Sequence, residues 1–204
     1  MTTPRLFQLE DMFKFNHIVL DPLVEVYSLP FLLPKILEYP DLVLSAVAPD
    51  DRLMGFILGT RIMDSKETHF IGEGKEKIAS HGHISALAVA HEYRRLGLGS
   101  GLMEIIRKLL DTFKDPYVDL FVRQKNVSAI CLYETLGYVK YRWLPQYYAN
   151  DHGYDMRLPL SSDVERRSLN GITRNKFYSF GNMIFNLLML YVVGIRHIFM
   201  GDTQ

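Results

Sequence analysis

The sequence predicts an α/β protein in which helices flank a central sheet, and three observations carry this prediction. The segment from His83 to Val89 is apolar and rich in strand-forming residues, as expected of a buried strand. A glycine-rich turn follows it, and after the turn apolar residues recur at helical spacing. A second unit begins at Tyr117, where a further buried strand precedes a helix that starts at Asn126. The apolar face of the first helix consists of Leu102, Ile105, Ile106, Leu109 and Leu110.

The remaining elements are predicted from turn signals, proline positions and short apolar runs. The sequence Pro49-Asp-Asp51 suits the turn of a hairpin. The polar stretch from Asp64 to Ser80 contains Gly72, Gly74 and a run of charges, and it predicts an exposed loop. In chain order we expect a strand at Arg5 to Gln8, a helix at Asp11 to Leu20, a helix ending before Tyr39, strands at Leu42 to Ala48 and Leu53 to Arg61, the loop, the two strand–helix units, and strands at Tyr138 to Leu144 and Asp155 to Leu158.

Length and composition bound the class of protein. The 204 residues suffice for one domain of ordinary size and a tail, which we place at residues 1–165 and 166–204. Basic and acidic residues number 23 each, so no overall charge favours nucleic acid or an anionic membrane as the main partner. The single cysteine cannot form an internal disulfide, and the N-terminus lacks the apolar core of a signal peptide. These features predict a cytoplasmic protein.

The tail contains a long apolar segment. No residue from Phe177 to Ile195 is charged, and a segment of this length and polarity reaches the threshold for a membrane-spanning helix. Asn182 and Asn186 weaken that interpretation. Segment 177–195 is therefore expected to anchor the domain on the cytosolic side of a membrane, to dock on a partner protein, or to be an atypical terminus.

The turn after the first buried strand has the features of an anion site. Gly97 and Gly99 let the backbone approach a ligand, and the first N–H groups of a helix have no partner within the helix. Arg94 and Arg95 add positive charge, so the N–H groups up to Ser100 suit a pyrophosphate. The turn by itself is equally compatible with an ordinary strand-to-helix connection.

The turn and the second strand–helix unit together resemble a known family. Arg94-x-x-Gly97-x-Gly99, followed by Asn126, Ala129, Tyr133 and Gly137-Tyr138, resembles the acetyl-CoA site of the GCN5-related N-acetyltransferase (GNAT) superfamily. The resemblance implies the GNAT fold, a mixed sheet whose two central strands splay apart to admit the pantetheine arm. It also implies acetyl-CoA as a substrate, no metal, and a cofactor site formed by Leu87, Val89, Arg94, Arg95, Gly97, Leu98, Gly99, Ser100, Asn126 and Tyr133.

Further motifs, over about residues 1–168, narrow the resemblance to the catalytic subunits of type B N-terminal acetyltransferases (NatB). They are Asp11-Met-Phe-Lys-Phe-Asn16, His81-Gly-His83, Val118-Asp-Leu-Phe-Val-Arg123, Tyr147-Tyr148 and Tyr154-Asp-Met-Arg157. This resemblance implies acetylation of the α-amine of proteins that begin Met-Asp, Met-Glu, Met-Asn or Met-Gln. It further implies an auxiliary NatB subunit that anchors the heterodimer on ribosomes, next to nascent N-termini.

The family match assigns roles to individual side chains. Tyr133 matches a tyrosine near the thioester sulfur and is expected to donate a hydrogen bond to the leaving group. His83 shares one strand face with Ser85 and Leu87, and it is expected to contact the second substrate residue or to relay the amine proton. The resemblance implies a peptide site formed by Glu25, Tyr27, His83, Ser85, Tyr147 and Tyr148. Ser28 stands where a glycine is expected.

Two other classes of function stay open. An acetyltransferase for lysine side chains or small amines acts on an amine with a pKa of about 10.4, and it should carry a carboxylate base in its cleft. The sequence alone does not single out such a carboxylate. A non-catalytic acyl-CoA-binding protein is the third class, and the combination of Tyr133 with the glycine turn argues against it.

Overall fold

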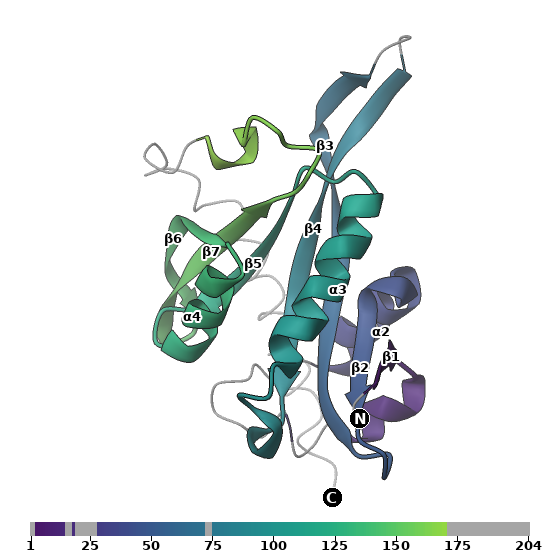
Figure 1. Cartoon of the computed structure of the whole chain (residues 1–204). Helices are drawn as coiled ribbons and strands as arrows, with labels where there is room; N and C mark the ends of the chain where they lie inside the picture. The colour runs from purple at the N-terminus through teal and green to yellow at the C-terminus, as the bar shows by residue number, and fades with distance from the viewer. Residues whose placement is uncertain (1–2, 15–17, 19–27, 72–74, 171–204) are drawn as a thin grey trace, which may run out of the picture.

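The computed structural model describes residues 3–14, 18, 28–71 and 75–170 (Figure 1). The apolar segment 177–195, Glu25 and Tyr27 lie outside these residues, so the expectations about them stay predictions. No helix within the described ranges is both long and apolar enough to cross a membrane. The described chain forms a sheet with helices against it.

The sheet has seven strands in the described part of the chain, in the order β1-β2-β3-β4-β5-β7-β6. Only β4 and β5 are parallel, and every other neighbouring pair is antiparallel, so the sheet is mixed as predicted. The strands are β1 (Thr3–Leu6), β2 (Val43–Val47), β3 (Leu53–Ile71), β4 (Lys75–Val89), β5 (Tyr117–Arg123), β6 (Val139–Tyr148) and β7 (Asp151–Pro159).

The α-helices of the described ranges lie where the sequence predicts helices. Pro30 stands in the first turn of α2, where a missing N–H costs no helical hydrogen bond. Asn126 caps α4, because its Oδ1 accepts the N–H of Ala129 at 3.2 Å. These helices are α2 (Leu29–Glu38), α3 (Leu98–Thr112) and α4 (Val127–Thr135), and the short 3₁₀ turns are η1 (Leu9–Lys14), η2 (Pro40–Leu42), η3 (His91–Tyr93) and η4 (Arg167–Leu169).

The N-terminal boundaries differ from the prediction. The first strand ends at Leu6 instead of Gln8, and the described start of the helix expected at Asp11 to Leu20 is a 3₁₀ helix, Leu9–Lys14. Ile18 is helical, whereas residues 15–17 and 19–20 of that expected helix lie outside the described residues. The buried carboxylate of Asp11 explains both shifts, because it accepts two hydrogen bonds from Arg5 at 2.7 and 2.8 Å and one from the N–H of Gln8 at 3.0 Å. These bonds turn the chain sharply after β1.

The expected loop at Asp64 to Ser80 is wrong, since this segment continues a hairpin. β3 runs on to Ile71 and β4 begins at Lys75, with antiparallel pairing up to the last pair, Ile71 with Lys75. Figure 1 shows the ribbon extending beyond the neighbouring strands. A two-stranded ribbon without sheet neighbours is held together by the hydrogen bonds between its own strands. Its sequence therefore does not need the alternation of apolar and polar residues by which strands are predicted.

The two central strands splay apart as expected. β4 and β5 pair only at Gly82 with Val118, His83 with Asp119 and Ile84 with Leu120. Beyond these pairs β4 stays bonded to β3 as far as Val89, whereas β5 stays bonded to β7 as far as Arg123. The sheet therefore divides into two halves after Ile84. Figure 1 shows β4 and β5 diverging from each other.

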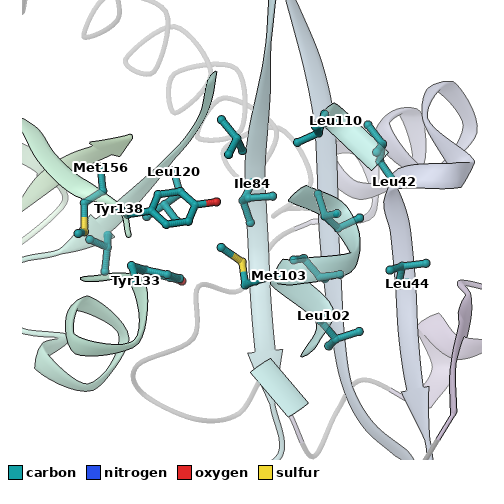
Figure 2. Close-up of a cluster of buried hydrophobic side chains, with 14 of the residues drawn as sticks. Leu42, Leu44, Ile84, Leu102, Met103, Leu110, Leu120, Tyr133, Tyr138 and Met156 are labelled. Atoms are coloured by element: carbon teal, nitrogen blue, oxygen red, sulfur yellow. The ribbon is translucent and has the colours of Figure 1, made fainter. Parts of the chain in front are cut away.

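One hydrophobic core joins the two halves. It contains residues of both central strands together with one face of α3 and the inner residues of α4, and Figure 2 shows part of it. Its members include Ile84, Leu102, Met103, Ile106, Leu110, Leu120, Tyr133, Tyr138 and Met156. α3 lies against β4 at Gly82, where the missing side chain makes room for Leu110.

Replacement of Gly82 with alanine is expected to destabilise the fold. A Cβ atom at this position would lie 2.4 Å from Leu110 Cδ1 and 2.8 Å from Cδ2, so the fully buried leucine would have to move. Overpacking of this kind costs about 1 to 3 kcal/mol of unfolding free energy. Urea denaturation measures it, with Gly101→Ala as the control, because a Cβ there meets nothing within 4 Å. Equal stability of both variants would contradict the packing described here.

Candidate active site

The space between the splayed strands is a groove. β4 forms one wall, and β5 with the start of α4 forms the other. Four predicted site residues besides Tyr133 line it, namely Ser85, Leu87, Asn126 and Tyr148. Tyr133, also predicted, lines it too, and the other lining residues are Phe56, Ile84, Ala86, Ala88, Leu120, Phe121, Val122 and Arg123.

The glycine turn precedes α3 at the far end of β4. Gly97 has a φ of 81°, the left-handed region that favours glycine, and it caps α3 without a side-chain hydrogen bond. The carbonyl oxygen of Gly97 accepts a hydrogen bond from the N–H of Gly101 at 2.9 Å. Within the described residues no backbone acceptor faces the N–H groups of residues 95–100. Arg94 fixes the turn to β4 through a 3.0 Å hydrogen bond from Nε to the carbonyl of Val89.

Gly99 lies between the two walls of the groove. A Cβ atom there would be 3.4 Å from Leu132 of α4 and 3.9 Å from both Leu87 and Val89 of β4. The absent side chain therefore keeps open the space where the turn, β4 and α4 meet. Leu98 and Ser100, also predicted to bind the cofactor, are half-buried in the first turn of α3, where backbone N–H groups rather than side chains would meet an anion.

Tyr133 is the most enclosed polar side chain of the groove, at 8% exposed. Figure 2 shows its ring on the α4 side of the core, beside that of Tyr138, whose centroid lies 5.9 Å away. Burial raises the pKa of Tyr133 to about 12, so the phenol stays protonated at neutral pH. Burial is the only cause of this shift, with no contribution from a hydrogen bond or a charge among the described residues.

His83 pairs with a buried carboxylate at the closed end of the groove. Its Nδ1 lies 2.7 Å from Oδ1 of Asp119, directly across the β4–β5 pairing, and His81 Nε2 lies 3.7 Å from the other oxygen. Burial raises the pKa of Asp119, but the charges of His83, His81 and Arg157 and the His83 hydrogen bond outweigh it and hold the pKa below its ordinary value. The carboxylate is therefore ionised.

Aromatic rings connect His83 with the mouth of the groove. The His83 ring lies 5.2 Å from Phe121, which contacts Tyr147 edge-on at 5.1 Å. Tyr147 and Tyr148 are nearly perpendicular at 83°, and Tyr148 lines the groove beneath the Arg123 guanidinium. Tyr147 thus packs against Phe121 while Tyr148 lines the groove, and the contact of either tyrosine with a peptide stays a prediction.

Two further residues singled out in the sequence, Ser28 and His81, do not line the groove. Ser28 caps α2 with a φ of −71°, which any residue adopts, so serine in place of glycine causes no backbone strain. His81 lies in the middle of its strand, because β4 begins six residues earlier, at Lys75. The described residues contain no group of three or more acidic, histidine or cysteine side chains arranged to hold a metal ion.

Comparison with known proteins identifies the family. Residues 8–138 match the model of the acetyltransferase (GNAT) family. The chain belongs to the GNAT family. Its relatives include N-alpha-acetyltransferase 20 of Dictyostelium discoideum, 42% identical over 171 residues that cover 83% of this chain and 92% of that protein. Another is the N-terminal acetyltransferase B complex catalytic subunit naa20 of Schizosaccharomyces pombe, 40% identical over 176 residues, with coverage of 83% and 91%.

Solved structures agree with this assignment. Naa20 of Chaetomium thermophilum in complex with a bisubstrate analogue has a TM-score of 0.73 and 33% identity, and the match covers 81% of this chain and 90% of that chain. The NatB acetyltransferase complex bound to CoA and MES has a TM-score of 0.66 and 31% identity, with coverage of 78% and 99%. The GNAT fold, the enzyme class and the resemblance to NatB catalytic subunits are thus confirmed.

Sequence reasoning missed one charged group of this GNAT site. Asp119 alternates along β5 with Tyr117, Phe121 and Arg123, so these four side chains share one face of the strand. That alternation is visible in the sequence and could have indicated a polar face. What the sequence does not contain is the register that sets Asp119 opposite His83.

Proposed function

We propose that the chain is the catalytic subunit of an N-terminal acetyltransferase of the NatB type. It transfers acetyl from acetyl-CoA to the α-amine of the initiating methionine in proteins that begin Met-Asp, Met-Glu, Met-Asn or Met-Gln. The observation that carries the proposal is the groove opened by the β4–β5 splay. The splay begins at the paired residues that include His83 and Asp119, and from there β4 runs on toward the glycine turn. The names of the relatives support it.

The cofactor end of the groove suits acetyl-CoA. The N–H groups of residues 95–100, which have no backbone acceptor within the described part of the chain, would hold the pyrophosphate together with Arg94 and Arg95. The pantetheine arm would extend along the unpaired edge of β4 past Leu87, whose backbone no longer bonds to β5. Asn126 faces the groove and caps α4 at once, so both roles expected of it are compatible. The neighbours solved with CoA and with a bisubstrate analogue support this use of the groove.

The acyl transfer makes modest demands on acid–base chemistry. An α-amine has a pKa of about 7.7 to 8.0, so much of it is already neutral near pH 7 and attacks the thioester carbonyl directly. The tetrahedral intermediate then expels the CoA sulfur, which leaves more readily when a neighbouring group donates a proton. Tyr133, enclosed in the groove and protonated, is the donor that we assign to this step. The C–S bond breaks as the sulfur takes the phenol proton, and the proton that the substrate nitrogen loses on becoming an amide returns to the phenolate, so the products are the neutral amide, the CoA thiol and the protonated tyrosine.

An auxiliary subunit completes the proposed enzyme. Two of the structural neighbours are NatB acetyltransferase complexes. Large apolar side chains are exposed on η1 and α2, with Phe13 exposed by 83% and Leu37 by 65%, and such surfaces are typical of contacts with another protein. Binding to ribosomes, where nascent N-termini emerge, and a cytoplasmic location follow from the same proposal.

Selectivity for the second residue is the sharpest test of the proposal. Peptides beginning Met-Asp, Met-Glu, Met-Asn or Met-Gln should be acetylated, whereas Met-Leu, Ser and Ala peptides should react poorly. A buried polar site left unpaired by an apolar residue costs about 1 to 3 kcal/mol, roughly five- to 150-fold in kcat/KM. Labelled acetyl transfer from acetyl-CoA to such a panel measures the preference. A preference for Met-Leu would instead indicate an N-terminal acetyltransferase of another type.

One observation supports a second function, the acetylation of lysine side chains. The pair of His83 and ionised Asp119 is the type of base that acetylation of a lysine side chain would need. The panel should therefore include a peptide with a blocked N-terminus and one internal lysine. Rapid acetylation of this peptide, with slow reaction at free α-amines, would refute the N-terminal assignment in favour of the lysine enzyme.

A further inference from the structure

An irregularity in the β6–β7 pairing precedes Tyr148. The register shifts between Leu144 and Tyr148, where β6 has more residues than β7 between the flanking pairs. Within this bulge the N–H of Gln146 donates to Nδ1 of His152 at 3.0 Å. Gln146 has a φ of 49°, in the left-handed region that residues other than glycine seldom adopt. A bulge bends its strand and redirects the side chains beside it, so the position of the Tyr148 ring is set locally.

Gly153 of β7 provides the space in which the Tyr148 ring lies. A Cβ atom at Gly153 would be 2.9 Å from Cε2 and 3.5 Å from Cδ2 of Tyr148, so a side chain there would displace the ring. Gly153 is buried and is not among the residues that line the groove. Its effect on the groove therefore passes through a neighbour, and the Tyr148 ring is the nearest side chain to it.

Arg123 of β5 contacts the same ring. Arg123 and Gly153 are partners in the β5–β7 register, so their positions share one face of the sheet. The guanidinium carbon of Arg123 lies 4.4 Å from the centroid of the Tyr148 ring, which is a cation–π distance. Tyr147 meets the ring edge-on at 5.0 Å. Three neighbouring residues thus fix the Tyr148 ring where it lines the groove.

We infer that Arg123 and Gly153 are positioning residues, which hold the Tyr148 ring at the mouth of the groove in the orientation that the peptide requires. The inference rests on the proposed function, because it takes Tyr148 as part of the peptide site. A ring that is already held need not be ordered when the peptide binds, and ordering one side chain weakens binding about three- to tenfold. The pair therefore acts on the binding of the peptide rather than on acetyl transfer.

The experiment measures kcat and both KM values for a Met-Asp peptide and acetyl-CoA, with the full chain and its co-purified partner. Arg123→Gln removes the cation and should raise KM for the peptide about three- to tenfold, with much smaller changes in kcat and in KM for acetyl-CoA. Arg123→Lys keeps a cation and should recover part of the affinity. Gly153→Val places a side chain against the ring and should raise the same KM about tenfold or more.

Lys125→Gln is the matched control for the loss of charge. Its side chain is 76% exposed, and its Nζ lies 3.9 Å from Asp151. Removal of this cation, on the same segment as Arg123, should leave KM for the peptide within about twofold. Urea denaturation of every variant shows whether a change in KM is accompanied by a loss of stability.

A double-mutant cycle with Tyr148→Ala separates positioning from direct contact, which matters because Arg123 itself lines the groove. Tyr148→Ala should raise KM for the peptide. In that background neither Arg123→Gln nor Gly153→Val should raise it further by more than about twofold, because the ring through which both act is gone. A purely structural role would instead lower stability and add its effect in both backgrounds.

An unchanged peptide KM in Arg123→Gln or in Tyr148→Ala would overturn the inference and leave the proposed function intact. A further rise on adding Arg123→Gln to Tyr148→Ala would also overturn it, since Arg123 would then contact the peptide directly. An equal rise in Lys125→Gln would do the same, because charge alone would explain it. Should Gly153→Val fail to fold, the Arg123 and Tyr148 variants still decide the matter. No acetylation of the peptide by the unaltered enzyme would refute the proposed function, and this inference with it.

Discussion

Tyr133→Phe is expected to lower kcat by a factor on the order of ten to a thousand, while KM for the peptide stays nearly unchanged. The substitution removes only the hydroxyl and keeps the ring in the core, where its burial contributes to stability. Because the phenol has a pKa of about 12, it acts as a donor over the whole working range of pH, and its loss affects departure of the sulfur rather than binding. Steady-state kinetics at saturating acetyl-CoA measures the change.

Tyr138→Phe is the matched control. Its ring lies 5.9 Å from that of Tyr133 and is 4% exposed, but it does not line the groove. The control should keep most of kcat, so a loss confined to Tyr133→Phe identifies the hydroxyl that meets the substrate. Unchanged turnover in Tyr133→Phe would remove this residue from the mechanism, and an equal loss in both variants would indicate a packing effect.

Gly99→Val is expected to raise KM for acetyl-CoA far more than KM for the peptide. Its Cβ would lie 3.4 Å from Leu132, and the two added methyl groups would fill the space where the turn meets β4 and α4. An increase on the order of ten- to a hundredfold corresponds to the loss of one or two hydrogen bonds from turn amides to the pyrophosphate. Initial rates at varied acetyl-CoA and fixed peptide provide the value.

Gly101→Val tests whether any valine in this helix turn has the same effect. Gly101 lies two residues further along α3, and a Cβ there meets nothing within 4 Å. Its KM values should stay close to those of the unaltered chain. If Gly99→Val raised both KM values equally, the glycine turn would not be the cofactor end of the groove.

Strand–turn–helix order could be predicted because each unit carries its own local signal. The buried strand β5, its capped helix α4 and the glycine turn before α3 all lie where the pattern places them. The β3–β4 hairpin beyond Asp64 could not be predicted, because a ribbon that extends past its neighbours lacks the core that imposes alternation.

The resemblance to the GNAT family placed individual residues at the candidate site, but it did not indicate their pairing. Gly97, Asn126 and Tyr133 were assigned through that resemblance, and the structure places all three at the groove or its turn, while their roles stay predictions. The contact of His83 with Asp119 joins positions 36 residues apart, and it depends on a parallel register that no local pattern encodes. The charge of the pair is likewise a property of the fold, since it comes from burial and from neighbouring charges.

The central claim is that the β4–β5 groove brings acetyl-CoA and a protein α-amine together, and bisubstrate inhibition tests it most directly. The inhibition constant is measured for CoA joined through an acetyl group to the α-amine of a Met-Asp peptide, and for the matched conjugate joined to a lysine side chain. The account predicts that the α-linked conjugate inhibits at least tenfold more tightly than the lysine-linked one, because only it places Met-Asp beside His83. Equal inhibition by the two conjugates, or tighter inhibition by the lysine-linked one, would contradict the account.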